Sequence, residues 1–364
     1  MRYILPSMSE VYESENRELF KVVSLFAGCG GSSTGYRLAG GKVLAINEFI
    51  PKACEAYHAN YPKTHIFSGD VRQLTGKMIL DQIGMVVGEL DLLDGSPPCA
   101  SFSMAGNREE GWGREKKYSD TTQRTDDLFL EYARIVKEIQ PKMFVAENVK
   151  GLTIGVANEL LGSEQMGLFG EHENTFFHTL SNCGYKVKFK VLNASHYGVP
   201  QARERLFIVG LRNDFDIPIT FPEPFPYRVT SLEALEGVVN SPKDIENSTH
   251  SEGVVLGYVK QLKEGESGDQ YAPSGYFGLQ RIERGKPCPT ICQRQGNKGA
   301  CLLHWSENRE LTIPELKRLH SLPDDFILNG SYKQNCERIG RSVPPLLMKA
   351  LIDHLYKTIL SKIV

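Results

Sequence analysis

The sequence contains no apolar run near the roughly 20 residues that a membrane-spanning helix needs. Its start, MRYILPSMSEVYESENRELF, has acidic residues where a secretory signal has its apolar core, so residues 1–20 are expected to form a loose leader ahead of the fold. An excess of charge of one sign is also missing, because the net charge is -2. Any cationic DNA-binding groups must therefore gather on one face. These absences favour a cytoplasmic protein with no membrane partner.

Cysteines in disulfide or metal-binding patterns are missing as well. The eight cysteines are scattered along the chain. Cys288 and Cys292 lie four residues apart, but no second pair has the spacing of a zinc site. We therefore expect reduced thiols and no metal.

An alternation of β-rich runs and helical stretches is present between about residues 21 and 214 of the 364. This alternation predicts an α/β fold with a doubly wound, largely parallel sheet, and the chain length predicts a second, smaller domain. Between residues 215 and 290, proline, glycine and aromatic residues among charges indicate that loop-rich domain. The expected strands cover residues 21–28, 42–49, 65–71, 90–98, 142–149, 185–195 and 204–212, and the expected helices include 51–61 and 127–141.

Three consecutive strand ends carry groups suited to a nucleoside. The stretch SLFAGCGGSSTG ends a strand in glycines, which let the backbone approach a ligand closely. Glu48 follows on the next strand and could accept both hydroxyls of a ribose, and Asp70 could accept from an adenine amino group. Ser33 occupies the third glycine position of a dinucleotide fingerprint, which counts against a nicotinamide oxidoreductase.

A cysteine and a glutamate indicate covalent chemistry at the same sheet edge. In DLLDGSPPCASFS, two prolines fix the backbone before Cys99, a candidate nucleophile. Glu147, in FVAENV, ends a buried strand and could donate a proton to a ring nitrogen. Arg203 and Arg205 lie two apart at a strand start and are expected to point to one face.

These stretches resemble the ordered motifs of the DNA cytosine-5 methyltransferases. FAGCGG, NE, GD, PPC, ENV, QARER, RELTIPELKRLHSLPDDF and GRSVPPLLMKAL occur in the family's order from about residue 21 to 356, interrupted at about 215–285. The resemblance implies a Rossmann-like fold that binds S-adenosylmethionine (SAM). It implies a catalytic and cofactor-binding domain (21–214), a target-recognition domain (215–290), and a C-terminal segment (291–364) that completes the catalytic domain.

The resemblance also implies roles for individual residues. Cys99 would attack position 6 of a cytosine flipped out of double-stranded DNA, and Glu147 would donate to its N3. Arg205, supported by Arg203, would hold the ring carbonyl, and residues 100–127 would form a mobile flap. Asn148 would be a structural hydrogen-bonding residue. The implied cofactor-site residues are Phe26, Gly28, Gly30, Asn47, Glu48, Phe49, Asp70, Val71, Pro98, Leu128, Arg341 and Ser342.

Three positions depart from the family pattern. Ser24 replaces the usual acid before LFAG, and Ala100 replaces the glutamine after the nucleophile. Arg341 replaces the asparagine of the last motif, beside a cationic sulfonium. Arg341 could pair with a nearby carboxylate such as Glu48 or turn to solvent. Alternatively, it could bind the carboxyl group of carboxy-S-adenosylmethionine, and the product would then be 5-carboxymethylcytosine.

Other functions stay open at this point. One branch of the family acts on tRNA, although the insert and PPCASFS do not point there. A DNA-binding regulator with a silent site is a non-enzyme alternative. Arg281, Arg284, Gln280 and Lys286 are candidate readers of the DNA target. A monomer is expected, and a restriction endonuclease encoded elsewhere could be a partner.

Overall fold

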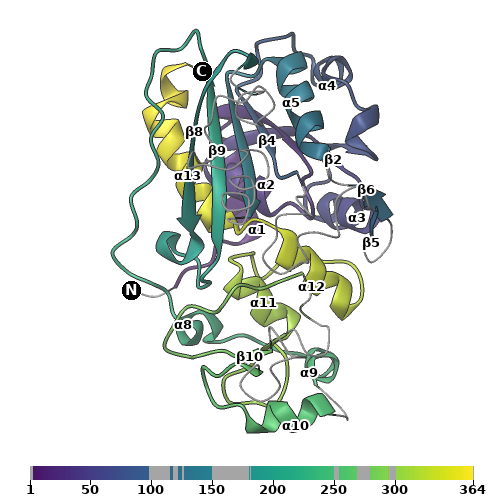
Figure 1. Cartoon of the computed structure of the whole chain (residues 1–364), viewed down its shortest axis with the longest axis vertical. Helices are drawn as coiled ribbons and strands as arrows, with labels where there is room; N and C mark the ends of the chain where they lie inside the picture. Colours follow the sequence, from purple (N-terminus) through teal and green to yellow (C-terminus); the bar gives the residue numbers. More distant parts are fainter. Residues whose placement is uncertain are drawn as a thin grey trace, which may run out of the picture.

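The computed structural model describes residues 3–97, 115–117, 122–124, 127–149, 180, 182–249, 254–268, 279–293, 295 and 301–363. A seven-stranded sheet forms the centre of the larger, upper part of the molecule (Figure 1). Its spatial order is β3-β2-β1-β4-β7-β9-β8. The strands are β1 Phe20–Leu25, β2 Gly41–Glu48, β3 His65–Ser68, β4 Leu92–Gly95, β7 Met143–Val149, β8 Tyr185–Asn193 and β9 Glu204–Arg212.

The sheet is doubly wound, as the sequence predicts. The pairs β1–β2, β2–β3, β1–β4 and β4–β7 are parallel, whereas β9 runs antiparallel to both β7 and β8. The chain builds outward from β1 in one direction to β3 and in the other to β7. The strand order therefore reverses between β1 and β4, which is where α/β sheets bind ligands.

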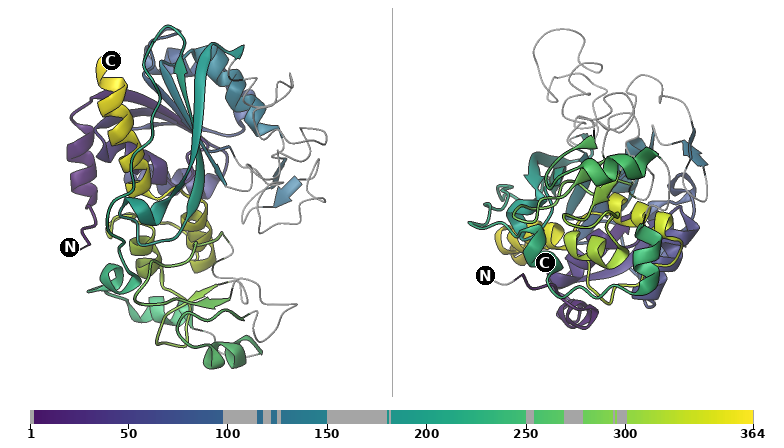
Figure 2. Two further views of the ribbon diagram at one scale, coloured as in Figure 1. Left: turned by 60° about the vertical axis from the view of Figure 1, so that its left-hand side comes forward. Right: turned by 90° about the horizontal axis from the view of Figure 1, so that it is seen from below.

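Each face of the sheet packs against its own set of helices, because successive strand residues point to opposite faces. Val22 and Val145 belong to the core that includes α1, α2, α3 and α13, whereas Val23 and Phe144 belong to the core under α4 and α5. In the left view of Figure 2, α1 and α13 lie on one side of the sheet and α5 lies on the other. These helices are α1 Met8–Glu15, α2 Gly31–Leu38, α3 Pro51–Asn60, α4 Gly76–Ile83, α5 Leu128–Ile139 and α13 Pro345–Thr358.

Residues 1–20 include a helix that was not predicted from the sequence. Ser7 caps α1 in a reciprocal capping box with Glu10, and the apolar side chains of Met8 and Val11 are buried in the main core. Val11 is completely buried. The expectation of a loose leader is therefore wrong for residues 8–15. The short amphipathic spacing in an acidic segment gave a weak helical signal, and only contact with the rest of the fold stabilises it.

The smaller, lower part of the molecule is built from short elements (Figure 1). A small separate core lies around α10 and β11, whereas α8 and α11 contribute to the main core. β10 pairs with β11, and α11 packs against α8. The pairing of β10 with β11 therefore crosses the domain boundary that was expected at residue 290. Within the expected C-terminal segment, only the later part returns to the large domain, where α13 packs on α2. The elements here and at the junction are α8 Ser231–Leu235, α9 Pro242–Ser248, α10 Val254–Gln261, β10 Gln280–Arg281, β11 Leu302–Leu303, α11 Ile313–Leu319 and α12 Tyr332–Arg341.

The remaining short elements complete the described chain. A two-stranded antiparallel ribbon joins β5 to β6. Of the helices within the described ranges, none combines the length and apolar character needed to cross a bilayer. The short elements are β5 Glu115–Lys117, β6 Thr122–Arg124, η1 Val71–Gln73, η2 Ala194–Tyr197 and η4 Leu360–Lys362.

Candidate functional site

The glycine-rich turn after β1 is open at Gly28, whereas a Cβ on Gly30 would lie 3.1 Å from the rings of Tyr57 and Tyr61. Gly28 has a φ of 58°, and a Cβ added to it would meet no atom within 4 Å. Gly30 also has a positive φ, and it begins α2 without a side-chain cap. Phe26 adopts the left-handed region as well, with a φ of 56°. A backbone held open in this way is suited to close approach by a ligand, so the turn fits the cofactor that the sequence motifs imply.

Glu48 at the end of β2 is tied directly to that turn. Its carboxylate accepts from the backbone N–H of Gly28 at 2.7 Å and of Ile50 at 2.8 Å. Burial raises the pKa of Glu48, and the two backbone N–H groups and the Arg338 guanidinium oppose this effect. The Glu48 carboxylate therefore positions the turn as well as lying where a ribose was expected.

Two other predicted side chains organise the neighbouring strand ends. Asn47 donates to the backbone carbonyls of Phe67 and Gly69 at 2.9 and 3.0 Å. Asp70 accepts from the backbone N–H of Arg72 at 3.0 Å and from its guanidinium at 2.8 Å. Arg72 also pairs with Asp127. A ligand amino group at Asp70 would thus share this carboxylate with an arginine.

Three of the other predicted cofactor-site residues are apolar and pack in hydrophobic clusters, and two more, Arg341 and Ser342, belong to the last motif. Phe49 packs against the small buried cluster at the start of α3. Val71 and Leu128 are both buried in the core under α4 and α5. A Cβ on Gly31 would lie 2.5 Å from the carbonyl of Val343. The last motif therefore lies directly against the start of α2.

Arg341 and Ser342 make contacts within the protein. The Arg341 Nε lies 3.1 Å from a carboxylate oxygen of Glu337, one turn earlier on α12. The sequence allows Arg341 to pair with a nearby carboxylate such as Glu48, and in the structure Glu337 supplies such a carboxylate. The Ser342 hydroxyl lies 2.9 Å from His320 Nε2 and donates to the Ile339 carbonyl at 3.0 Å.

Glu147 and Arg205 form a buried ion pair across β7 and β9. Their Oε1 and Nε atoms are 3.0 Å apart. Burial raises the pKa of Glu147, and the guanidinium groups of Arg205 and Arg203 and the Ser96 hydroxyl oppose this rise. A carboxyl group with a raised pKa can hold a proton and donate it to a ring nitrogen.

Arg203 has a different position from Arg205. It is 1% exposed, and it donates to the backbone carbonyls of Ile291, Gly340 and Ser342 at 2.9 to 3.0 Å. Its guanidinium thus joins β9 to the last motif. This geometry fits the supporting role predicted for it, because the hydrogen bonds of Arg203 go to the protein.

The strand that leads to the predicted nucleophile is anchored beside Glu147. Asn148 donates to the carbonyl of Pro97 at 3.0 Å, which confirms that Asn148 is a structural hydrogen-bonding residue. Pro98 and Cys99 lie outside the described residues, as do most of residues 100–127, where a mobile flap was expected. Their predicted roles stay predictions.

A further buried carboxylate at this edge, Asp94, was not predicted from the sequence. Asp94 on β4 accepts hydrogen bonds from the hydroxyl groups of Ser24, Ser32 and Tyr36. The signal available was Ser24, which stands where the family usually has an acid. The parallel register pairs Ser24 with Asp94, so the acid is present on the neighbouring strand.

The prediction that Arg281 reads DNA is wrong. The residue is 3% exposed. Its guanidinium donates to the backbone carbonyls of Val259, Leu262, His304 and Glu307 and to the side chain of Asn308. Arg284 is half-exposed and pairs with Glu264. Arg281 therefore holds the small domain together.

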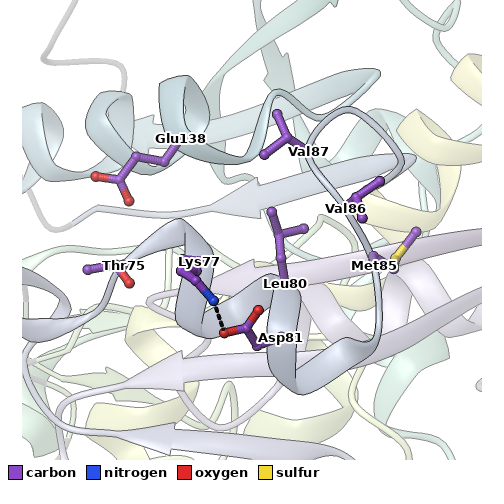
Figure 3. Close-up of a pocket in the computed structure, with 8 residues that line it drawn as sticks. All are labelled: Thr75, Lys77, Leu80, Asp81, Met85, Val86, Val87 and Glu138. Atoms are coloured by element: carbon purple, nitrogen blue, oxygen red, sulfur yellow. Dashed lines mark hydrogen bonds and ion pairs between the residues drawn. The ribbon is translucent and has the colours of Figure 1, made fainter.

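A cavity of about 620 Å³ lies away from the residues described above (Figure 3). It opens between α4, the segment after it and α5, and Figure 3 shows Val86, Val87 and Met85 around it. None of the predicted site residues contributes to its lining. Its residues are Thr75, Lys77, Leu80, Asp81, Met85, Val86, Val87 and Glu138.

Comparison with known proteins places these features in one family. The model of the C-5 cytosine-specific DNA methylases matches residues 20–357. A Type II methyltransferase of Haemophilus parahaemolyticus, M1.HphI, is 30% identical over 98% of this chain and 89% of its own length. The Type II methyltransferase M.PspPI of a Psychrobacter strain is 31% identical over 95% of this chain and 81% of its own length.

Solved structures share the fold at lower sequence identity. A prophage-encoded E. coli protein described as a DNA modification methyltransferase superposes with a TM-score of 0.71 at 22% identity, covering 93% of this chain and 99% of the other. A DNMT2 structure from Spodoptera frugiperda gives a TM-score of 0.64 at 19% identity, with 93% and 99% coverage. Both likenesses concern the fold alone.

Proposed function

Because the chain belongs to the family of C-5 cytosine-specific DNA methylases, we propose that it methylates carbon 5 of a cytosine in duplex DNA. The observation that carries the proposal is the buried Glu147–Arg205 pair, which lies beside the anchored end of β4. When bound, SAM would supply a methyl group activated by a sulfonium. Phe26, Gly28, Gly30 and Glu48 would hold it at the glycine-rich turn.

The residues of this chain would divide the reaction into easier steps. The Cys99 thiolate adds to ring position 6, and Glu147 gives a proton to N3, which makes position 5 nucleophilic. Arg205 orients Glu147 and contacts the ring carbonyl. After methyl transfer, a base removes the proton from position 5, the bond from Cys99 to position 6 breaks to release the thiolate, and N3 returns its proton to Glu147. The cytosine must first leave the base stack to reach these groups.

Cys99 is tested by product analysis and by trapping. Duplex DNA incubated with the protein and SAM should contain 5-methylcytosine by mass spectrometry, and Cys99→Ser should yield none. Duplex DNA containing 5-fluorocytosine should form a covalent complex with the unaltered protein. Undiminished methylation by Cys99→Ser would contradict the covalent mechanism.

The same assay distinguishes the alternative functions. If tRNA is modified and duplex DNA is not, the protein is a tRNA methyltransferase. If 5-fluorocytosine DNA is bound without a covalent complex, the protein is a silent DNA-binding regulator. The similarity of this chain to Type II methyltransferases supports a role in a restriction–modification system, in which a restriction endonuclease encoded elsewhere would be the partner enzyme. Protection of methylated DNA from one restriction enzyme, with the modified sequence identified, would test this.

Carboxymethyl transfer is the second candidate for the chemistry. It requires Arg341 to meet the carboxyl group of carboxy-S-adenosylmethionine. The Glu337 carboxylate, 3.1 Å from Arg341, already supplies an anion, and this contact favours SAM as the donor. Offering both cofactors with duplex DNA should yield 5-methylcytosine, and Arg341→Asn should leave that product unchanged. A product heavier by a carboxyl group would favour the second candidate.

A further inference from the structure

Ser96, the residue after β4, carries a hydroxyl group that the proposed function leaves without a role. The hydroxyl oxygen is buried, and it closes no hydrogen bond with the residues that the structure describes. Buried hydroxyl groups without a partner cost stability and are rare in folded proteins. Alanine would fill this position without that cost, so the hydroxyl group of Ser96 requires an explanation.

The backbone of Ser96 continues β4 beyond Gly95, the last residue of the strand. Its N–H donates to the carbonyl of Leu25, the last residue of β1, at 3.4 Å. Pro97 follows, and a residue before proline is restricted to extended conformations. Ser96 therefore keeps the alternation of the strand, in which successive side chains point to opposite faces, and its side chain lies on the same face as that of Asp94.

Glu147 is the residue of β7 that lies beside Ser96. β4 and β7 are parallel, and Gly95 pairs with Ala146. The next position along both strands therefore brings Ser96 and Glu147 together, with their side chains on one face of the sheet. Asn148 holds the carbonyl of the residue after Ser96 at 3.0 Å, so the two chains stay side by side beyond this point.

The Glu147 carboxyl group therefore has a neighbour on each side. On the β9 side, the Arg205 Nε lies 3.0 Å from its Oε1. On the β4 side lies the Ser96 hydroxyl group. Burial raises the pKa of Glu147, and Arg205, Arg203 and the Ser96 hydroxyl group oppose this rise. The arginines and the serine thus act on the same carboxyl group from different strands.

The other titratable groups near Glu147 belong to β4, β9 and the small part of the molecule. Asp94 lies on the same face of β4, and burial raises the pKa of Asp94 to about 6, with a smaller contribution from Glu147. The thiol of Cys292 lies within electrostatic reach of Arg203 and Arg205 on β9. None of these groups changes when the hydroxyl group alone is removed, so a comparison of variants isolates the effect of Ser96.

We infer that Ser96 is a positioning residue, whose hydroxyl group and the Arg205 guanidinium together hold the Glu147 carboxyl group from both sides in the orientation that meets the flipped cytosine. The inference rests on the proposed function. In that reaction Glu147 gives its proton to N3 and becomes a carboxylate. The buried hydroxyl group then gains an acceptor, and its hydrogen bond stabilises the carboxylate until N3 returns the proton.

Removing the hydroxyl group should make Glu147 hold its proton more tightly. In Ser96→Ala, the alkaline limb of kcat/KM for methylation of duplex DNA should move upward by about one pH unit, and kcat/KM below the limb should fall by up to about tenfold, the size expected for one hydrogen bond to a charged group. The variant should not unfold at a lower urea concentration, because the hydroxyl group has no partner among the described residues. Ser96→Thr keeps the hydroxyl group and should restore the limb.

The infrared carboxyl band of Glu147 follows the same proton without any reaction. The band is identified by its loss in Glu147→Gln and is titrated in the full chain without DNA. Its midpoint should also rise by about one pH unit in Ser96→Ala. Ser24→Ala is the matched control, because it removes another buried hydroxyl group on this face of the sheet, one that donates to Asp94 at 2.6 Å. The Glu147 midpoint should not move in this control.

The outcomes separate this inference from the proposed function. An unmoved infrared midpoint in Ser96→Ala overturns the inference, and so does an equal rise in Ser24→Ala. A midpoint that rises while the alkaline limb stays in place also overturns it, because Ser96 would then act on a proton that the reaction does not use. If the unaltered protein methylates no duplex DNA, the proposed function fails, whereas the infrared titration still decides whether Ser96 acts on Glu147.

Discussion

Glu147 pairs with Arg205 and is also the proton donor of the proposed mechanism. Burial raises its pKa, and Arg205 at 3.0 Å limits that rise. In the proposed mechanism the protonated form would donate to N3, so activity should fall as pH rises through this pKa. We expect Glu147→Gln to lower kcat/KM by about 10²- to 10⁴-fold, the usual contribution of general acid catalysis. Steady-state rates against pH check this, and an unaltered alkaline limb in the variant would contradict the assignment.

Asp94 should reduce the stability of the protein without cofactor. Its folded-state pKa of about 6 lies above the value of roughly 3.9 for an unfolded aspartate, and each unit of difference is worth about 1.4 kcal/mol. The ionised form is therefore costly in the folded state above pH 6. Asp94→Asn should raise the free energy of unfolding by roughly 1–3 kcal/mol at pH 8. This gain should shrink below pH 6 and disappear near pH 4.

Chemical denaturation at pH 8 and pH 5 measures this difference. A variant that is less stable than the unaltered protein at pH 8 would show that the carboxylate stabilises the fold. The expected result is a buried carboxylate that costs stability when it is ionised.

Among the secondary-structure elements, helix α1 contributes a charged contact to the core. Its last residue, Glu15, pairs at 3.1 Å with Arg37 of α2, whose side chain is fully buried. Removing one partner leaves a buried charge less compensated. Glu15→Gln should lower the free energy of unfolding by about 2–3 kcal/mol in urea titrations, because Tyr57, Thr64 and the ring of Tyr61 still contact the guanidinium.

Glu18→Gln, three residues after the end of α1, is the matched control for Glu15→Gln. Glu18 pairs with Lys42 at 3.1 Å, and the two side chains are 56% and 35% exposed. Exposed pairs contribute little, so the loss should stay below about 0.5 kcal/mol. Equal losses in the two variants would show that burial does not decide the value of these contacts.

The contact between α2 and α13 depends on a glycine. A Cβ on Gly35 would lie 2.5 Å from the Cβ of Met348 and 2.6 Å from the carbonyl of Pro345. Gly35→Ala should therefore push the helices apart and cost about 2 kcal/mol or more. Gly257 in α10 has no such neighbour, and Gly257→Ala should stabilise by about 0.5–1 kcal/mol. Thermal unfolding of both variants checks this, and losses in both would point to a general cost of alanine.

At the scale of the whole molecule, a buried polar network joins segments that are distant in sequence. Gln201 contacts His320, His320 contacts Ser342, and the Ser342 carbonyl accepts from Arg203. Burial lowers the pKa of His320 well below its usual value, and the Arg203 guanidinium adds to this effect. A neutral His320 fits a network that already holds one cation.

Arg203→Lys should loosen this junction. A lysine ammonium cannot reproduce the planar fork that reaches three carbonyls, so at least one acceptor would stay buried without a donor. We expect a loss of about 2–4 kcal/mol by denaturant unfolding. Arg205→Lys makes the same exchange two residues later and should cost at most about 1 kcal/mol, because its pairing with Glu147 needs one cation. Similar losses at both positions would contradict a structural role specific to Arg203.

The sequence by itself determined the sheet and most of its strand ends. Strands such as Met143–Val149 are short apolar runs bounded by turn residues, and Leu128–Ile139 repeats apolar residues with helical period, so local patterns were sufficient. The glycine turn, Glu48, Asp70 and Glu147 were predicted for the same reason, because the carboxyl ends of parallel strands meet at one edge.

Only the tertiary structure decided how charged side chains are paired. Arg281 and Arg284 look alike in the sequence, yet one is buried among carbonyls and the other is half-exposed. The carboxylates that Arg341 and Arg37 meet, and the three hydroxyl groups around Asp94, come from side-chain positions that no local pattern specifies. Strand and helix periods follow from neighbouring residues, whereas the energy of a charge depends on burial and on partners that are brought close only by the complete fold.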